Sequence, residues 1–185
     1  MTLYSVILFF HLLGALALFA ALGLEWRLLR YMELAKSVDE LRVLAGAGGV
    51  LPGLNGFAAA FILLPAFYLT TRMKAWPQGW ISIALLGTLI IAGLGMAITG
   101  PRTRALRKVC AEPKASWSEE LQRAARQPLL RTSFRLRLAL GLAIVFLMAS
   151  KSGYGVSIAV AGIALALAFV FSLSRNKTGQ KRDYA

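Results

Sequence analysis

Most of the residues that carry chemistry are scarce in this sequence. Its 185 residues include one cysteine, Cys110, one histidine, His11, and eight acidic residues against 21 basic ones. A single cysteine excludes an intrachain disulfide. The sequence also lacks a Gly-rich phosphate loop, a Ser-His-Asp set, an HExxH motif and a zinc-ligand spacing. We therefore expect a non-enzymatic protein rather than an enzyme.

Charge is missing from long stretches of the chain. Five apolar windows together hold one of the 29 formal charges, Arg137, although the net charge is +13 and the mean hydropathy is +0.65. This segregation excludes a soluble enzyme, a disordered basic tail and a nucleic-acid-binding domain, and it predicts an all-α polytopic bundle of transmembrane helices. The five predicted spans are Leu3–Leu24, Leu44–Leu69, Trp80–Thr99, Leu136–Ser150 and Val156–Leu173.

The basic residues predict how the spans are oriented. Eighteen of the 21 fall before the second span, between the third and fourth spans, or after the fifth, whereas only Arg72, Lys74 and Lys151 fall on the other side. Because cytoplasmic segments are enriched in Lys and Arg, we predict an external N-terminus and a cytoplasmic C-terminus. We expect a multi-pass protein of the bacterial inner membrane.

The spans divide the chain into three parts. We expect a four-helix core over 1–151 with cytoplasmic loops at 25–43 and 100–135, a fifth helix at 152–174 and a basic cytoplasmic tail at 175–185. In the second loop, Ser116 is predicted to cap a short helix that ends at Gln127. The basic loops are expected to face anionic lipid headgroups, or to serve only as charge that fixes orientation.

Three polar residues are predicted to share one layer in the outer half of the membrane. A rise of about 1.5 Å per residue puts His11, Asn55 and Thr88 roughly 12 to 14 Å from the outer face. Polar groups at that depth are costly unless they face the bundle interior, so each is a candidate binding residue. The alternative is that His11 and Asn55 make structural hydrogen bonds. The external cations Arg72, Lys74 and Lys151 are predicted to lie near this layer.

Small residues recur at helical spacing in the first three spans. They are Gly14 in the first, Gly49, Gly53 and Gly56 in the second, and Gly87 and Gly95 in the third. Such faces pack helices closely in lipid, either within one chain or between chains. Two prolines, Pro52 and Pro65, are predicted to break the second span on either side of Asn55, which would let that span line a cavity.

Several segments resemble one group of bacterial membrane proteins. The run Phe10–Ala15 with the exit Glu25-Trp26-Arg27, the Gly100-Pro101-Arg102 ending and the Phe146–Lys151 ending resemble the copper-resistance-D-like group, which includes the small membrane protoporphyrinogen oxidases. The resemblance covers about residues 3–151. The oxidases also use a lysine within a later helix, and this chain has no lysine in any predicted span.

The resemblance implies a four-helix core in which His11 is a metal ligand that binds haem b. On that hypothesis the protein is a redox protein, Arg72, Lys74 or Lys151 pairs with the propionates, and the second ligand is His11 of a second copy or Met148. The main hypothesis is instead an accessory or assembly subunit whose small-residue faces dock another membrane protein or a second copy. A small permease is the weakest alternative, because five spans show no evident inverted repeat.

Overall fold

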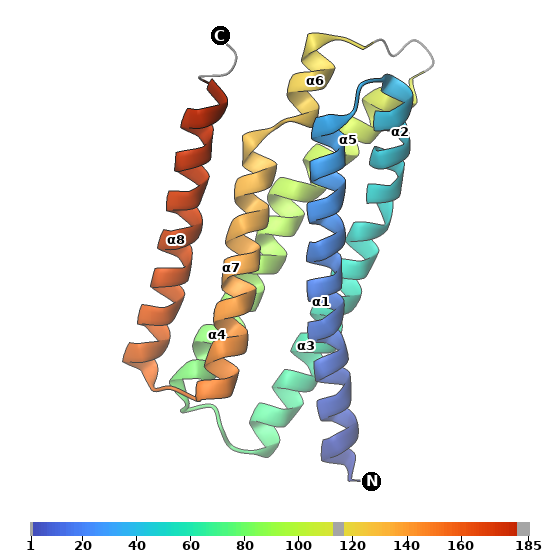
Figure 1. Cartoon of the computed structure of the whole chain (residues 1–185). Helices are drawn as coiled ribbons and strands as arrows, with labels where there is room; N and C mark the ends of the chain where they lie inside the picture. Colours follow the sequence, from blue (N-terminus) through green and yellow to red (C-terminus); the bar gives the residue numbers. More distant parts are fainter. Residues whose placement is uncertain (1, 113–116, 181–185) are drawn as a thin grey trace.

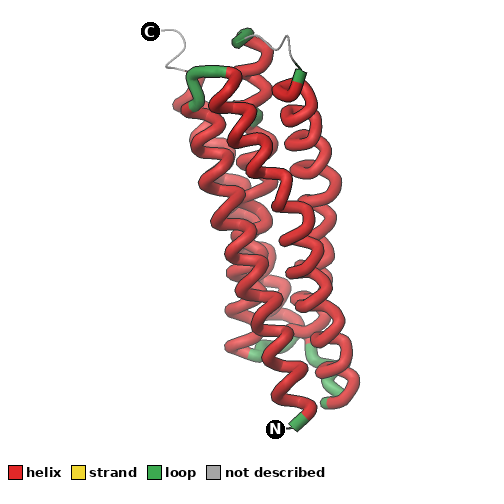
Figure 2. The backbone as a smooth tube through the Cα atoms, turned by 90° about the vertical axis from the view of Figure 1, so that its right-hand side faces the viewer, coloured by secondary structure: helices red, strands yellow, loops and turns green. Residues whose placement is uncertain are grey.

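The chain forms a bundle of long helices. The computed structural model describes residues 2–112 and 117–180, the last nine of these as backbone only. Every regular element in that part of the chain is helical, as the tube in Figure 2 shows. The predicted all-α class is confirmed.

Five helical stretches are long and apolar enough to cross a membrane, which confirms the predicted number of spans. Two of the spans contain a change of helix type, and a third follows a short helix across a brief turn. The first span is α1 (Leu3–Leu34). The second consists of α2 (Val38–Ala47), a 3₁₀ turn η1 (Gly48–Val50) and α3 (Leu51–Arg72), and the third of α4 (Gly79–Leu94), a π-helix η2 (Gly95–Thr99) and α5 (Gly100–Ala111). The fourth is α7 (Pro128–Ser150), which follows the short α6 (Glu119–Ala125), and the fifth is α8 (Tyr154–Gln180).

The helices form two groups that meet along α1 and α7 (Figure 1). In one group α1 packs along α3, and in the other α7 packs against both α4 and α8. The start of α1 and the end of α8 lie at opposite ends of the bundle (Figure 1), as an odd number of spans requires. The turn between α7 and α8 is tight, because Lys151 takes a left-handed conformation with φ 49° and ends α7.

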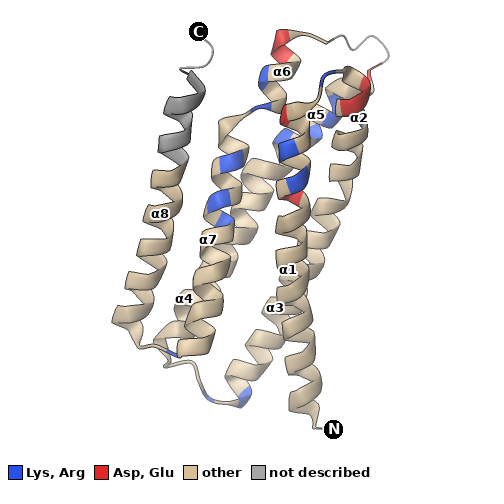
Figure 3. Cartoon of the chain, viewed as in Figure 1, with Lys and Arg blue, Asp and Glu red and all other residues tan. Residues whose placement is uncertain are grey.

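Charged side chains gather at one end of the bundle, where α2, α5 and α6 lie (Figure 3). We call this the charged end. Arg72, Lys74 and Lys151 lie near the turns at the opposite end. The predicted cytoplasmic location of the charged end rests on this asymmetry.

The segments 25–43 and 100–135, predicted as cytoplasmic loops, are largely helical in the described part of the chain. Four of the spanning stretches have 32 to 35 residues, whereas about 20 cross the hydrocarbon core. The excess residues of α1 join α2, α5 and α6 in a compact cap, where the buried Leu28, Leu41 and Cys110 belong to one apolar cluster. Burial of this apolar surface explains why the segments fold instead of remaining open loops.

Three local predictions can be compared with the structure. Ser118 caps α6, with its hydroxyl accepting the backbone N–H of Leu121 at 3.3 Å, whereas the predicted cap Ser116 lies outside the described residues. Pro52 lies in the first turn of α3, directly after η1 separates α3 from α2, so the second span does change helix type next to this proline. Pro65 does not break the span, because α3 continues past it to Arg72.

Candidate functional site

The predicted ligand His11 joins α1 to α3. Its side chain is 6% exposed, and its Nδ1 lies 3.0 Å from the carbonyl oxygen of Ile62. One turn away, the helices touch so closely that a Cβ on Gly14 would lie 2.6 Å from the carbonyl carbon of Phe61. The two helices therefore leave no room for a haem between them at this level. His11 acts here as a hydrogen-bonding contact between two tightly packed helices.

The structure does not bring the predicted polar layer together. His11 is level with Ile62, and Asn55 lies seven residues along α3 from it, an offset of about 10 Å. The prediction failed because it measured depth from Leu44, which lies in α2 and not at the membrane end of α3. The Thr88 hydroxyl donates to the carbonyl of Ala84 in its own helix at 2.9 Å.

The predicted rim cations are also remote from His11. Arg72 lies ten residues along α3 from Ile62, about 15 Å toward the end of the bundle. Lys74 and Lys151 occupy the turns that follow α3 and α7. Among the described residues no group of three or more His, Cys, Asp and Glu side chains is placed to hold a metal ion.

A buried ion pair that the sequence did not reveal connects α1 to α7. Glu25 and Arg137 are each 1% exposed, and the guanidinium of Arg137 pairs with the carboxylate of Glu25. Arg137 also donates to Thr99 Oγ1 at 3.0 Å, and Thr99 Oγ1 lies 3.3 Å from Ser133 Oγ. In the described part of the chain, Glu25 Oε2 and Arg137 Nε have no hydrogen-bond partner.

The π-helix η2 completes this polar cluster, beside Glu25 on α1 and Arg137 on α7. It carries Thr99 at its end and Gly95 at its start, where a Cβ would lie 3.6 Å from Arg137 Nη1. A π-helix adds one residue to a turn and changes which side chains face inward. In this bundle the π-helix sits beside the only charged residue of the apolar windows, Arg137.

Glu25 directly follows the predicted span Leu3–Leu24 and was therefore predicted to begin the cytoplasmic loop 25–43. The signal that could have placed it was Arg137 itself, since a charge within an apolar span needs a buried counter-charge. A second pair, Arg131 with Glu33, joins the same two helices nearer the charged end. The two pairs together fix α1 against α7.

The glycines separate into two classes. Gly14 packs on the backbone of α3, a Cβ on Gly87 would lie 3.1 Å from Ile144, and Gly95 faces Arg137. These three residues serve packing within the chain. By contrast, Gly53 and Gly56 have nothing within 4 Å of an added Cβ, and both are exposed.

The outward glycines form part of a continuous small-residue surface on α2, η1 and α3. We call it the glycine face, and it consists of Gly46, Gly49, Gly53, Gly56 and Ala60, all exposed. Twenty residues counted back from Arg72 reach Gly53, so we expect Gly53, Gly56 and Ala60 to lie within the membrane and Gly46 and Gly49 at its boundary.

A cation lies at the membrane boundary of the glycine face. The Nη1 atom of Arg107, an exposed residue of α5, would be 2.7 Å from a Cβ on Gly49. No acidic residue in the described part of the chain pairs with Arg107. The glycine face therefore combines a flat apolar strip with a positive charge at one end.

The chain matches no family model, no curated protein and no solved structure.

Proposed function

We propose that this multi-pass helical membrane protein is a non-enzymatic accessory or assembly subunit, and that its glycine face docks a transmembrane helix of another membrane protein. The observation that carries the proposal is the outward position of Gly53 and Gly56. Each glycine inside a helix costs about 1 kcal/mol relative to alanine. Within this chain nothing packs on these two positions to offset that cost.

Small residues let two helix backbones approach closely, and van der Waals packing of this kind drives helix association in lipid. Gly49 and Gly53 have GxxxG spacing, and Gly56 and Ala60 repeat the small-residue spacing one turn later. A surface that faced lipid alone would gain no stability from this spacing. A second helix packed on the surface would gain close van der Waals contact with it.

The charge of the chain favours a different protein over a second copy as the partner. Two copies in one membrane share an orientation, so their strongly basic ends would face each other across the interface and repel. Arg107, unpaired beside Gly49, instead favours a partner helix that carries an acidic residue at the same membrane boundary.

The haem alternative has weaker support. A ligating histidine commonly donates its other ring N–H to a backbone carbonyl, and the contact of His11 with Ile62 O has that geometry. However, α1 and α3 leave no space for a haem between them at this level. We therefore expect the purified protein to lack a Soret band.

The test is affinity purification of the tagged full chain from native membranes. Gly53→Leu and Gly56→Leu are expected to lose the partner while the chain still inserts, and the matched control Gly162→Leu is expected to keep it. Gly162 is also an exposed helical glycine with nothing within 4 Å of an added Cβ, but it lies on α8. Equal recovery of the partner with all three variants would contradict the proposal.

A charge exchange adds a second criterion. Arg107→Glu is expected to weaken the complex, and replacing the acidic residue of the partner by lysine is expected to restore it. A complex that contains only copies of this chain would also overturn the proposed partner.

A further inference from the structure

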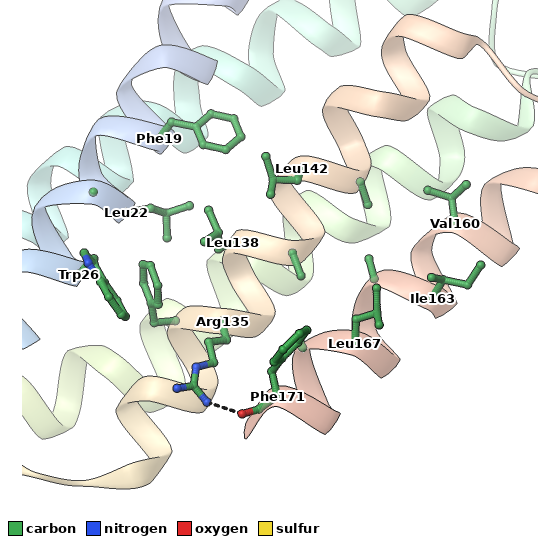
Figure 4. A pocket seen from close by; sticks show the side chains of 16 residues that line it. Phe19, Leu22, Trp26, Arg135, Leu138, Leu142, Val160, Ile163, Leu167 and Phe171 are labelled. Atoms are coloured by element: carbon green, nitrogen blue, oxygen red, sulfur yellow. Dashed lines mark hydrogen bonds between the residues drawn. The ribbon is translucent and has the colours of Figure 1, made fainter. Parts of the chain in front are cut away.

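An elongated groove lies on the other side of the bundle, with α7 as its floor and α1 and α8 as its walls (Figure 4). Its volume is about 1070 Å³, at the upper end of the range for ligand-binding cavities. Nearly all of its lining side chains are apolar, and Phe19, Leu142 and Leu167 are among them. The groove is open on one side, so in a membrane it is accessible to lipid.

The groove has the depth of one membrane leaflet. Along α7 it extends from Phe134 to Ala143, a rise of about 14 Å, and along α8 from Val160 to Phe171, a rise of about 16 Å. Half of a hydrocarbon core of about 30 Å is about 15 Å. The groove runs parallel to the helices, so an acyl chain of that leaflet fits along its length.

The two ends of the groove differ in polarity. Trp26, Arg135 and Phe171 lie at the charged end, one on each of the three helices that form the groove. Arg135 Nη1 donates to the carbonyl oxygen of Phe171 at 2.9 Å, which holds the guanidinium across the mouth (Figure 4). The opposite end, at Phe19 and Val160, is apolar.

Trp26 adds an amphipathic contact at the mouth. Its ring stacks on Phe134 with centroids 5.4 Å apart, and the side chain remains 43% exposed. Its indole N–H has no hydrogen-bond partner among the described residues. Tryptophan at this level is typical of contact with lipid headgroups and the ester region.

From this combination we infer that the groove binds a phospholipid with an anionic headgroup, in the leaflet at the charged end. One acyl chain lies along α7 between α1 and α8, and the phosphate faces the guanidinium of Arg135. A guanidinium binds phosphate through paired N–H donors. The groove extends over about one leaflet, whereas a transmembrane partner helix would require an apolar contact surface across the whole hydrocarbon core.

Contact quenching of Trp26 fluorescence tests this site in the full chain. The parent variant retains Trp26 alone, with Trp76, Trp80 and Trp117 changed to Phe. It is reconstituted into phosphatidylcholine vesicles that contain a fixed minor fraction of one lipid with brominated acyl chains. That lipid is brominated phosphatidylglycerol in one series and brominated phosphatidylcholine in the other. Because one basic residue near the surface favours an anionic lipid about fivefold, we expect the apparent affinity for brominated phosphatidylglycerol to be about fivefold higher.

Two pairs of variants separate headgroup recognition from groove occupancy. Arg135→Gln is expected to abolish the preference, and Arg104→Gln to retain it, since Arg104 also donates to a backbone carbonyl near the charged end but lies on α5. Ala164→Phe fills the groove and is expected to reduce quenching by both lipids. Ala166→Phe, on an exposed face of α8 outside the groove, is expected to leave quenching unchanged.

Three results would overturn the inference. Equal quenching by the two brominated lipids in the parent variant would indicate ordinary contact with surrounding lipid. An unchanged preference in Arg135→Gln would exclude the proposed headgroup contact. Absence of quenching by either lipid would show that something other than lipid fills the groove.

Discussion

The buried pair of Glu25 and Arg137 provides the sharpest prediction about stability. Both side chains are 1% exposed, and Arg137 has one further side-chain partner, Thr99. Removing one member of a buried ion pair leaves an uncompensated charge and costs about 3 to 5 kcal/mol. Glu25→Gln retains an oxygen acceptor for Arg137, so we expect a loss of about 3 kcal/mol. Glu25→Leu removes the charge and the acceptor together, so we expect the free energy of unfolding to fall by about 5 kcal/mol.

The double variant Glu25→Leu/Arg137→Met is the critical comparison. It removes both charges and leaves none unpaired, so we expect it to recover most of the stability lost in Glu25→Leu. The exposed pair Glu119 with Arg123 offers a control, and Glu119→Gln is expected to cost no more than about 0.5 kcal/mol.

The assay is equilibrium unfolding of the full chain in mixed micelles with increasing denaturing detergent, followed by circular dichroism. The reasoning is refuted if Glu25→Leu unfolds at the same detergent fraction as the native chain. The single variant Arg137→Met completes the comparison. The reasoning is also refuted if the double variant loses as much stability as Glu25→Leu and Arg137→Met added together, because the two residues would then not act as a pair.

Other contacts give shorter predictions. Gly14→Leu forces a side chain into the backbone of α3 and is expected to destabilise the fold by about 1 to 3 kcal/mol in the same assay, whereas an unchanged midpoint would mean that α1 and α3 do not pack this closely. His11→Ala removes the contact with Ile62 O and is expected to cost about 1 to 3 kcal/mol, without any change in the visible absorption spectrum; loss of a Soret band would instead support haem ligation. Cys110 is fully buried, so maleimide should label it only after unfolding, and rapid labelling of the folded chain, detected by mass spectrometry, would contradict the packing of the cap.

The membrane architecture was predictable because it follows from long uncharged runs, which have one physical solution in lipid. The packing of the helices at the charged end was not predictable, because apolar residues interleaved with charges indicate a helix but do not show which helices pack together. Leu41 and Cys110 lie far apart in the sequence, and their contact depends on how α2 and α5 fold back together.

The candidate sites also depend on contacts between helices that the sequence does not show. Depth counting identified His11 as a buried polar residue, but it could not show that the partner of His11 is the carbonyl of Ile62. Glycine spacing identified small-residue faces without distinguishing Gly14, which packs inward, from Gly53, which faces outward. The direction in which a helix face points depends on which helices are neighbours, and one sequence does not encode that information locally.

The proposed docking role is tested most directly by photocrosslinking in intact native membranes. A photoreactive phenylalanine replaces Phe57, an exposed residue beside the glycine face, and in a matched variant it replaces the exposed Phe169 on α8. We predict that position 57 crosslinks to a transmembrane segment of one different protein, that this crosslink disappears when Gly53→Leu is added, and that position 169 does not form it. Crosslinks from position 57 to lipid alone, or to a second copy of this chain, would contradict the proposal.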